Sequence, residues 1–357
     1  MATTILSIVP ELYSTKIAVS EDEKIIYHAE IIHDDNDLIK YDNIIEQIPL
    51  RIDSIIIQLR KDSVNIKTIE YVVAEGGLLR PCKPGVYTIN KSMVGDLIEG
   101  IAGTDIINLG GLLAFTLANN LGIKSFVIDP ASVDERSEMA AFTPHPSLRK
   151  KSLFHALIHK YLSRKYAEAT KCDYKDLNII FCHANERNVS VAAHKKGKVI
   201  DVNQAYMGYG PMGLCEIGTL PASDIIDLFF MKCYSKDEAI RLINTKGTAL
   251  SFLETLSFKA ISDAIMNKNK KAKLFLDAMA YQISKEIASH YVSLEGRIDV
   301  IILSGTLFSI NSFTRNIMAS ITNIAPIFCY DKDYTFEALI DNALHAINSK
   351  TEIRTYI

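Results

Sequence analysis

Two short turns in the sequence carry side chains that bear on phosphate binding. The first turn, Pro10–Tyr13, holds Glu11, and the second, Ala184–Val189, holds Glu186 and Arg187. Paired strand–turn–strand loops that grip the phosphates of a nucleotide offer backbone N–H groups and use glycines to permit close approach. Neither turn contains a glycine. The sequence therefore places carboxylates where a nucleotide-binding protein needs hydrogen-bond donors.

A second set of residues could act by proton transfer. Glu75, Asp105, Asp129 and His183 would form an acid–base constellation if the fold brought them together, because His, Asp and Glu are the usual general acids and bases. Taken alone, His183 is equally a hydrogen-bonded histidine at the end of a strand. The six cysteines lie far apart and form no CxxC pair, a pattern that indicates neither a zinc site nor a redox pair.

Apolar and alternating stretches predict the strands that would position these residues. In the first 130 residues the order is three strands, then helix and strand alternately, and from Leu177 the same order recurs. The predicted strands are Ile5–Val9, Lys16–Ser20, Ile25–Ile32, Ile69–Val73 and Ser125–Ile128, then Asn178–Cys182, Ser190–His194, Lys198–Val202, Asp299–Leu303 and Ile327–Tyr330. In each copy the second and third strands resemble a hairpin, so each copy should build a mixed sheet with helices on both faces.

The recurrence predicts two domains. The polar, proline-containing stretch Pro144–Arg149 marks the boundary and gives domains of residues 1–147 and 148–357, with a last helix near Phe336–Ile347. Leu220–Glu295 is helical by pattern and would be an insertion in the second domain. Its basic run, Lys268–Lys273, is expected to be a solvated helix turn.

The composition is typical of a globular protein. Of the 357 residues, 48% are hydrophobic and 23% are charged, and 39 Lys and Arg stand against 42 Asp and Glu. The formal net charge of −3, without a basic block, argues against nucleic-acid binding. No apolar run approaches the roughly 18 residues that span a bilayer, and no signal-like basic and apolar stretch opens the chain. We therefore expect a cytoplasmic protein that binds neither nucleic acid nor membrane.

Seven segments closely resemble butyrate kinases, in order and with nearly constant spacing from residue 5 to about residue 347. They are ILSIVPELYSTKIAV from Ile5, VVAEGGLLRPCKPGVY from Val72, INLGGLLAF from Ile107, SFVIDPASVDE from Ser125, RKKSLFHAL from Arg149, HKKGKVIDVN from His194 and IDVIILSG from Ile298. Butyrate kinases belong to the acetate kinase group within the actin-like superfamily of acetate and sugar kinases. The resemblance implies an α/β fold of two duplicated actin-like (ribonuclease H-like) domains around a central cleft. It also implies reversible transfer of the γ-phosphoryl group of ATP, with Mg²⁺, to a short-chain carboxylate.

The resemblance assigns roles to residues in several motifs. Catalytic positions match Lys16, Asp129, His183 and Glu337, of which Asp129 and Glu337 would also contact Mg²⁺ indirectly. Nucleotide-binding positions match Ser14, Thr15, Ser190 and Gly305, and substrate-binding positions match Gly76, Gly77 and Asn108. Each of three residues also has an interpretation that needs no ligand. Lys16 could be a surface lysine that begins a strand, and Asp129 could simply end a strand before a proline. Glu337 could be one of the acidic residues that are common in the first turn of a helix.

The ligand-facing motifs depart from the family pattern. VPELYSTK from Val9 stands in place of NPGSTSTK, and CHANERNVSV from Cys182 stands in place of AHxGGGISV. AEGG in place of GRGG puts Glu75 where an arginine is expected, and LCEIG in place of PERSG puts Glu216 where a second one is expected. SGTLF in place of TGGIA puts Thr306 at a glycine position. The scaffold motifs are kept, whereas both phosphate turns lose their glycines.

These departures favour a butyrate kinase-like protein with a degenerate active site, in which ATP and Mg²⁺ bind weakly or not at all. Such a chain would serve as a regulatory pseudoenzyme or as a folded partner, in a homodimer or in a heterodimer with an active family member, through the apolar faces of Leu220–Glu295. The alternative is an active short-chain carboxylate kinase in which Arg187 or Arg80 replaces a lost cation. A third reading is repurposed catalysis by the acid–base constellation.

Overall fold

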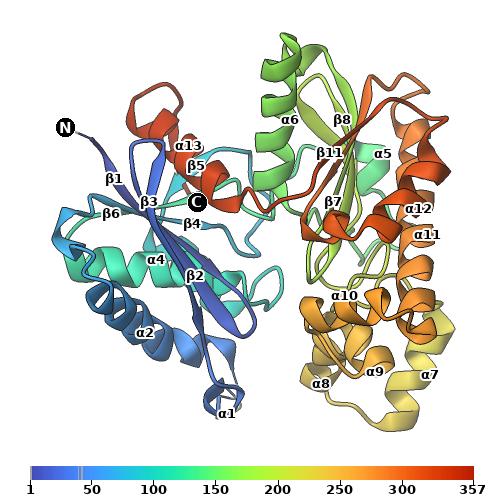
Figure 1. Ribbon diagram of the computed structural model, residues 1–357, viewed down its shortest axis with the longest axis horizontal. Helices are drawn as coiled ribbons and strands as arrows, with labels where there is room; N and C mark the ends of the chain where they lie inside the picture. Colours follow the sequence, from blue (N-terminus) through green and yellow to red (C-terminus); the bar gives the residue numbers. More distant parts are fainter. Residues whose placement is uncertain (1, 39, 42) are drawn as a thin grey trace. The chain divides into compact units, whose positions relative to one another are not determined.

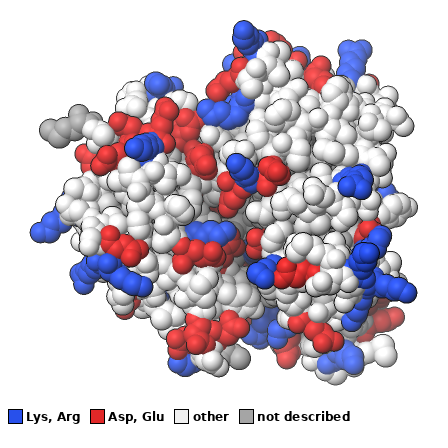
Figure 2. Space-filling view, viewed as in Figure 1, with Lys and Arg blue, Asp and Glu red and all other residues white. Residues whose placement is uncertain are grey.

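The computed structural model describes residues 2–38, 40–41 and 43–357, which fall into two compact units (Figure 1). Unit 1 comprises the chain up to Asp134 together with Tyr334–Ile357, and unit 2 comprises Glu135–Asp333. Each unit is built on one mixed β-sheet. Figure 2 shows Lys and Arg side chains interspersed with Asp and Glu over the visible face. Among the described residues, no helix is long and apolar enough to cross a membrane.

Unit 1 contains a seven-stranded sheet in the order β12-β5-β6-β4-β1-β2-β3. The strands are β1 (Thr4–Pro10), β2 (Ser14–Glu21), β3 (Lys24–Ile32), β4 (Tyr71–Glu75), β5 (Val86–Thr88), β6 (Lys124–Ile128) and β12 (Ile353–Thr355). Its helices are α1 (Asp35–Leu38), α2 (Ile48–Lys61), α3 (Lys91–Glu99), α4 (Asn108–Leu121) and α13 (Thr335–Ile347). Helices α2 and α4 cover one face of the sheet and α13 covers the other (Figure 1).

Unit 2 contains a five-stranded sheet in the order β11-β10-β7-β8-β9. The strands are β7 (Asn178–Ala184), β8 (Val189–Lys195), β9 (Lys198–Val202), β10 (Val300–Ser304) and β11 (Ile327–Tyr330). Its helices are α5 (Glu138–Ala141), α6 (Ala156–Thr170), α7 (Ala222–Lys232), α8 (Lys236–Arg241), α9 (Ala249–Leu253), α10 (Phe258–Met266), α11 (Lys270–Ser293) and α12 (Asn311–Ile321). The predicted helical insertion corresponds to α7–α11.

The two sheets repeat one plan, as the sequence predicted. In unit 1, β1, β2 and β3 pair antiparallel, and β1, β4 and β6 pair parallel. In unit 2, β7, β8 and β9 pair antiparallel, and β7, β10 and β11 pair parallel. Both hairpins even shift register near the end of their second strand, at Val19/Ser20 and at Ala193/His194. The strand–turn–strand loops β1–β2 and β7–β8 therefore occupy equivalent places in the two units.

The division of the chain differs from the predicted domains 1–147 and 148–357. Unit 2 already begins at Glu135, and Tyr334–Ile357 belongs to unit 1. The reason is that β12 pairs with β5 and α13 packs on β1, β4 and β6, while α6, which follows the first copy in sequence, packs on β7. The last helix of each copy thus completes the sheet of the other copy. A single cut in the sequence cannot describe that exchange.

Close packing of α4 on the sheet explains a retained glycine pair. Helix α4 is apolar on most sides, and Gly110 and Gly111 are buried with its leucines. A Cβ at Gly110 would lie 2.7 Å from the carbonyl oxygen of Glu75 at the end of β4, and one at Gly111 would lie 2.8 Å from the Leu97 side chain. Glycine therefore lets the helix approach the strand at backbone distance. This contact fixes the segment after β4.

Candidate active site

The β1–β2 turn places a carboxylate beside the predicted catalytic lysine. The Glu11 N–H donates to the Ser14 carbonyl at 2.9 Å and closes the turn. The Glu11 carboxylate lies 3.5 Å from Lys16 Nζ, and the Lys16 side chain is 28% exposed. The ammonium group is thus paired with the anion of Glu11, which stands where the resemblance leads one to expect a glycine.

The two hydroxyl residues after this turn, Ser14 and Thr15, are buried and bonded within unit 1. Ser14 Oγ donates to Glu30 Oε1 at 2.8 Å, across the β2–β3 hairpin. Thr15 Oγ1 lies 2.8 Å from His33 Nε2, just after β3. Both predicted nucleotide-binding hydroxyls are therefore engaged by the protein itself.

Arg51, which no sequence motif singled out, binds the β1–β2 turn through hydrogen bonds from helix α2. It is fully buried on α2 and donates to the carbonyl of Ser14 at 2.7 Å, to Thr15 Oγ1 at 2.9 Å and to the carbonyl of Leu12 at 3.2 Å. Burial lowers the pKa of Arg51 to about 10, so the guanidinium stays charged at neutral pH. Burial, and then the charge of Arg51, lower the pKa of His33 to about 4.

A sequence signal for Arg51 exists. The buried stripe of α2 consists of Arg51, Ile52, Ile55 and Leu59. An arginine on the apolar face of an amphipathic helix is unusual, because a buried charge is costly unless it is hydrogen-bonded. Such a residue therefore predicts a buried set of acceptors, here the carbonyls of the turn.

Gly76, Gly77 and Asn108 form one packed junction between β4 and α4. A Cβ at Gly77 would lie 2.7 Å from the Cα of Asn108, and one at Gly76 would lie 2.7 Å from the Cα of Pro130. The Asn108 side-chain oxygen accepts from the Leu78 N–H at 2.8 Å, and its Nδ2 donates to a backbone carbonyl at 3.0 Å. These contacts give the three residues a structural role, and their binding of substrate stays a prediction.

Asp129 ends β6 in a left-handed backbone conformation, with φ of +38°. Its Oδ1 accepts from the Gly85 N–H at 2.7 Å, and its own N–H donates to the Gly85 carbonyl at 2.9 Å. The side chain is buried. Glu337, the other predicted Mg²⁺ contact, lies in the first turn of α13. The carboxylate of Asp129 is therefore oriented by the backbone of the segment before β5.

The described residues offer no closed metal site. Nowhere in residues 2–38, 40–41 and 43–357 do three or more His, Cys, Asp or Glu side chains gather so that they could hold a metal ion. Mg²⁺ keeps several waters and takes only one or two carboxylates beside the substrate phosphates. An indirect contact of Asp129 and Glu337 with Mg²⁺ stays a prediction.

Arg80, one of two candidates to replace a lost cation, pairs with a carboxylate that also binds the C-terminal segment. Its guanidinium donates to both oxygens of Asp96, at 2.6 and 2.9 Å, and the Tyr356 hydroxyl donates to the same carboxylate at 2.7 Å. The pair with Arg80 holds the pKa of Asp96 below its usual value. Arg80 therefore anchors the C-terminal segment to unit 1, which accounts for its presence without a phosphate ligand.

The β7–β8 turn binds its own backbone. Asn185 Oδ1 accepts from the N–H of Arg187 at 2.9 Å and from the N–H of Asn188 at 3.0 Å. The carbonyl of Arg187 accepts from the N–H of Cys215 at 2.8 Å, and a Cβ at Gly213 would lie 2.4 Å from that carbonyl. Two N–H groups in the middle of the turn are thus already bonded to a side chain of the turn.

Gly305 marks a close approach between β10 and this turn. Its φ is +113°, and a Cβ there would lie 2.3 Å from the carbonyl oxygen of Ala184. Its N–H donates to the carbonyl of Tyr330 at 3.1 Å. Only glycine fits this conformation and this distance. The structure therefore explains Gly305 by packing, and its contact with a nucleotide stays a prediction.

His183, the next-to-last residue of β7, lies beside a second histidine that the sequence motifs did not single out. Its Nδ1 lies 3.2 Å from Ser304 Oγ, and its ring centre lies 4.6 Å from that of His155. Burial lowers the pKa of His183 to about 4, although Asp333 opposes the shift. His155 precedes α6 by one residue and His159 follows four residues later. Two histidines at that spacing on one helix face were the signal that could have identified them.

Ser190, at the start of β8, lies between these two helix-borne histidines. Its Oγ is 2.7 Å from His155 Nδ1 and 2.8 Å from His159 Nε2, and the residue is fully buried. Ser190 was predicted to bind a nucleotide. The structure places its hydroxyl inside unit 2 between two imidazole rings.

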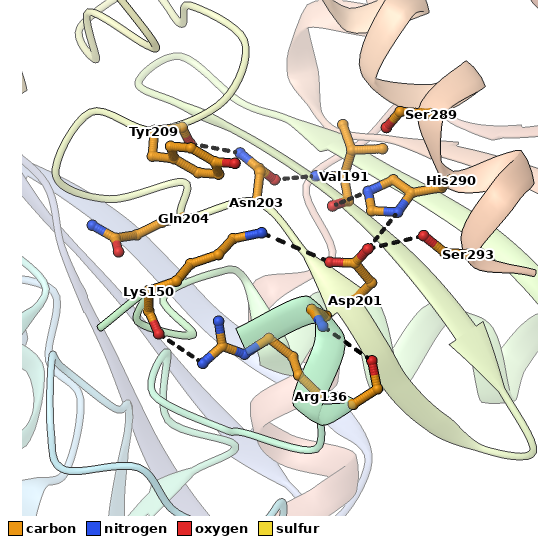
Figure 3. Close-up of polar contacts among 12 residues, drawn as sticks. Arg136, Lys150, Val191, Asp201, Asn203, Gln204, Tyr209, Ser289, His290 and Ser293 are labelled. Carbon is orange, nitrogen blue, oxygen red and sulfur yellow. Dashed lines mark hydrogen bonds and ion pairs between the residues drawn. The ribbon is translucent and has the colours of Figure 1, made fainter. Parts of the chain in front are cut away.

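A polar cluster around Asp201 connects β8 with its neighbours β9 and α11 (Figure 3). Ser293 Oγ donates to Asp201 Oδ2 at 2.9 Å, and His290 Nε2 donates to the carbonyl of Val191 at 3.1 Å. Asn203 Oδ1 accepts from the N–H of Val191 at 2.7 Å. The cluster joins β8 and β9 to α11, so it positions the strand that leaves the β7–β8 turn.

The predicted site residues therefore fall into two groups. Unit 1 holds Ser14, Thr15, Lys16, Gly76, Gly77, Asn108, Asp129 and Glu337, and unit 2 holds His183, Ser190 and Gly305. Of the acid–base constellation, Asp105 is buried and accepts from the N–H of Ile107 at 3.1 Å, before α4. Glu75, Asp105 and Asp129 belong to unit 1 and His183 belongs to unit 2, so their convergence stays a prediction.

Comparison with known proteins identifies the family. A family model described as the acetokinase family matches residues 142–325. Butyrate kinase 2 of Clostridium acetobutylicum is 38% identical over 352 residues, which cover 99% of this chain and 99% of that protein. The chain belongs to the acetokinase family. Within it, the chain is butyrate kinase-like over 99% of its length.

Solved structures of the acetokinase family share the fold. Acetate kinase of Porphyromonas gingivalis superposes with a TM-score of 0.74 at 16% identity, covering 97% of this chain and 100% of that one. A propionate kinase of Francisella tularensis gives a TM-score of 0.74 at 13% identity, covering 95% and 98%. The predicted fold class, two duplicated actin-like α/β domains, is confirmed by these matches and by the repeated sheet plan.

Proposed function

We propose that this chain is a butyrate kinase-like member of the acetokinase family whose own phosphoryl transfer is lost. The family reaction converts ATP and butanoate to ADP and butanoyl phosphate. In our proposal the chain binds ATP and Mg²⁺ weakly or not at all and acts as a folded partner or regulatory pseudoenzyme. The observation that carries the proposal is that each strand–turn–strand loop already bonds to itself: Lys16 pairs with Glu11 in one, and the N–H groups of Arg187 and Asn188 donate to Asn185 in the other.

The β1–β2 turn supports the proposal through charge. Glu11 stands where relatives have a glycine, and its carboxylate is 3.5 Å from Lys16 Nζ. A phosphate at that lysine would have to displace or face the carboxylate, and two like charges about 4 Å apart repel by roughly 4 kcal/mol at an effective dielectric constant near 20. Lys16 is therefore compensated by the protein before any nucleotide arrives.

The β7–β8 turn supports it through hydrogen bonding. Phosphate loops bind anions with backbone N–H groups that point at the ligand. Here the N–H groups of Arg187 and Asn188 already donate to Asn185 Oδ1. Removing one preorganised donor typically costs roughly 10²–10³ in rate. A turn that bonds to itself therefore offers little stabilisation to a transferring phosphoryl group.

An exposed apolar helix supports the partner role. No residue of α7 is buried, and Ile226, Phe230 and Met231 are 57%, 79% and 81% exposed. Large side chains of this kind on one helix mark interaction surfaces. We assign α7 to the contact with a second copy of this chain, and a heterodimer with an active family member would use the same surface.

A second candidate function is an active short-chain carboxylate kinase with a remodelled phosphate site. It is favoured by one observation, the presence of a buried arginine, Arg187, within the altered turn. An arginine can bind phosphate oxygens in bidentate fashion and so replace several lost donors. Lys16, Asp129 and His183 would then keep their family roles.

One assay separates the two candidates. The purified chain is incubated with ATP, MgCl₂ and butanoate, and acyl phosphate is trapped with hydroxylamine, with Butyrate kinase 2 of Clostridium acetobutylicum as the active control. Kinases turn over at about 1–100 s⁻¹, and our proposal predicts a rate at least about 10³-fold lower. A rate within the kinase range that Arg187→Ala abolishes would overturn the proposal in favour of the active enzyme.

A further inference from the structure

Helix α11, Lys270–Ser293, carries apolar side chains on its outer side as well as on its inner side. The inner side packs on β7, β8 and β9, and α12 lies beside the helix (Figure 1). A surface helix normally carries polar and charged side chains on the side that faces water. Here Leu274, Tyr281 and Val292 are 62%, 66% and 79% exposed. The outer side of α11 is therefore an unusual surface for a helix in contact with solvent.

These three side chains belong to one stripe along the helix. The stripe has six residues, none of them buried, at successive spacings of 4, 3, 4, 3 and 4 positions: Leu274, Ala278, Tyr281, Lys285, Ala288 and Val292. Residues three and four positions apart are neighbours on a helix surface, and this alternation is the spacing at which two helices pack along their length. Only Lys285 is charged. We call these six residues the α11 stripe.

The spacing of the α11 stripe is the same from either end of the helix. A second copy of α11 can therefore lie antiparallel on the first, about a two-fold axis at the middle of the stripe. This arrangement produces three kinds of facing pair, each formed twice: Leu274 with Val292, Ala278 with Ala288, and Tyr281 with Lys285. The stripe is thus a surface that can pair with itself in one register.

The side chains of each facing pair suit one another. Leucine against valine removes apolar surface from water at both ends of the stripe. Alanine against alanine lets the two helix axes approach closely, because their distance depends on the side chains at the contact. A tyrosine ring against a lysine is a cation–π pair, and Lys285 Nζ already lies 5.5 Å from the centre of the Tyr281 ring within one chain.

Charges beside the stripe match in the same register. Lys271 lies three positions before the stripe, and Glu295 lies three positions after it. The antiparallel arrangement brings Lys271 of each copy to Glu295 of the other. The Glu295 side chain is 66% exposed although it lies 2.8 Å from Lys195 Nζ, so its charge is available at the surface. A parallel arrangement would instead place Lys271 and Lys285 against themselves, so the charges favour the antiparallel one.

We propose that the α11 stripe is the centre of a two-fold contact between two copies of this chain, in which the two α11 helices lie antiparallel. The inference rests on the partner role proposed above and names the surface at the two-fold axis. Stable interfaces use about 20–30 residues on each side, which is more than the stripe supplies. Helix α7 therefore adds its exposed apolar face to the same contact.

Cysteine cross-linking tests the register. The two exposed cysteines, Cys172 and Cys233, are first replaced by serine. In that background, a chain with both Ala278→Cys and Ala288→Cys should form a disulfide-linked dimer on mild oxidation, because each new thiol faces the other one of the second copy. Ala278→Cys alone should give no linked dimer, since its two copies lie ten positions apart along the helices, about 15 Å, which is too far for a disulfide. A linked dimer from this single variant would show a different register and overturn the proposal.

Matched substitutions test the contribution of the stripe to association. Ala278→Glu places a carboxylate in the stripe and should yield a monomer by light scattering at micromolar concentration, with unchanged thermal unfolding. Ala260→Glu, at an exposed alanine of α10, is the matched control and should stay dimeric. Lys271→Glu should weaken the dimer about 2–30-fold, and the addition of Glu295→Lys should restore its affinity.

Failure of this inference can be told apart from failure of the proposed function. If the unaltered chain is a dimer that Ala278→Glu leaves intact, or if the double cysteine variant stays unlinked, the pairing of α11 is wrong and the dimer forms elsewhere, as through α7 alone. A monomeric unaltered chain also overturns the pairing. The loss of phosphoryl transfer is measured separately by the acyl phosphate assay. Should Ala278→Glu fail to fold, the cross-linking decides, because cysteine is close to alanine in size.

Discussion

At the scale of single residues, several charges and donors of the two strand–turn–strand loops are bonded within the protein. Lys16 is paired with Glu11, the hydroxyls of Ser14 and Thr15 are bonded within the sheet, and Asn185 binds the N–H groups of its own turn. Buried polar groups are costly to leave unbonded. In our proposal, these internal bonds take the place of contacts to a ligand.

Arg51 offers the clearest test of this internal bonding. Arg51→Met should lower the free energy of unfolding by about 3 kcal/mol, because two carbonyls and a threonine hydroxyl lose their donor inside the protein. Urea denaturation measures the change. Arg60→Met, on the exposed side of the same helix, is the matched control and should change stability by less than about 0.5 kcal/mol. Equal effects of the two substitutions would refute the role of Arg51.

The buried histidines predict a pH dependence of stability. The folded-state pKa of His183 is lowered to about 4, and those of His155, His159 and His194 are also lowered. Unfolded imidazoles take up protons near pH 6.5, so below that pH the unfolded state binds more protons. Each such group then removes about 1.4 kcal/mol of stability per pH unit until its folded pKa is reached, and the full contribution is present above pH 6.5.

Chemical denaturation between pH 8 and pH 5 measures this effect. The free energy of unfolding should be nearly constant above pH 7 and should fall steeply below about pH 6.5. His28→Gln removes an exposed histidine and should leave the slope unchanged. A flat profile from pH 7 to pH 5 would mean that these histidines are not neutral and buried in the native protein.

At the scale of elements, the sequence predicted the long strands but not the shortest ones, and it did not reveal why Gly305 must be a glycine. The long strands were found because their apolar alternation continues over five or more residues, as in Lys24–Ile32. Strands β5 and β12 were missed, because a strand of three residues is too short to show periodicity. Gly305 was matched from a motif, but its reason, the approach to Ala184, lies between segments distant in sequence.

The close approach at Gly305 predicts opposite outcomes for two glycine substitutions. Gly305→Ala should lower the free energy of unfolding by at least about 3 kcal/mol, since its φ of +113° and the 2.3 Å distance to the Ala184 carbonyl leave no place for a Cβ. Gly95→Ala, inside α3 with nothing within 4 Å, should stabilise by about 0.5–1 kcal/mol. Thermal unfolding of both variants checks this pair, and a harmless Gly305→Ala would contradict the packing described here.

At the scale of the whole molecule, the sequence revealed the duplication but not the exchange of helices. Both copies were visible because each has three strands followed by alternating helices and strands. The sequence patterns of α6 and α13, in contrast, do not indicate which of the two sheets each helix covers. Their placement depends on which apolar face meets which sheet, and that information is not local in the sequence. The absence of glycines from the two turns was visible in the sequence, but the bonds that Glu11 and Asn185 make within these turns could be found only from side-chain positions.

Association is the prediction that belongs to this scale. If α7 forms the contact with a second copy, the chain should have twice its monomer mass by light scattering at micromolar concentration. Replacing Phe230 and Met231 by serine should yield monomer with unchanged stability, because both side chains are exposed within the chain. Met139→Ser, at an exposed methionine of α5, should leave the dimer intact. If the unaltered chain is a monomer, α7 does not form a contact with a second copy.

The central proposal, that internal bonds in the β1–β2 and β7–β8 turns replace contacts to a nucleotide, is tested most directly by calorimetric titration of the chain with ATP and Mg²⁺. We predict a dissociation constant no tighter than about 1 mM, a binding free energy of about −4 kcal/mol or weaker, because Glu11 and Asn185 occupy the cation and the donors that a phosphate would use. Micromolar affinity for ATP with Mg²⁺ would contradict the account.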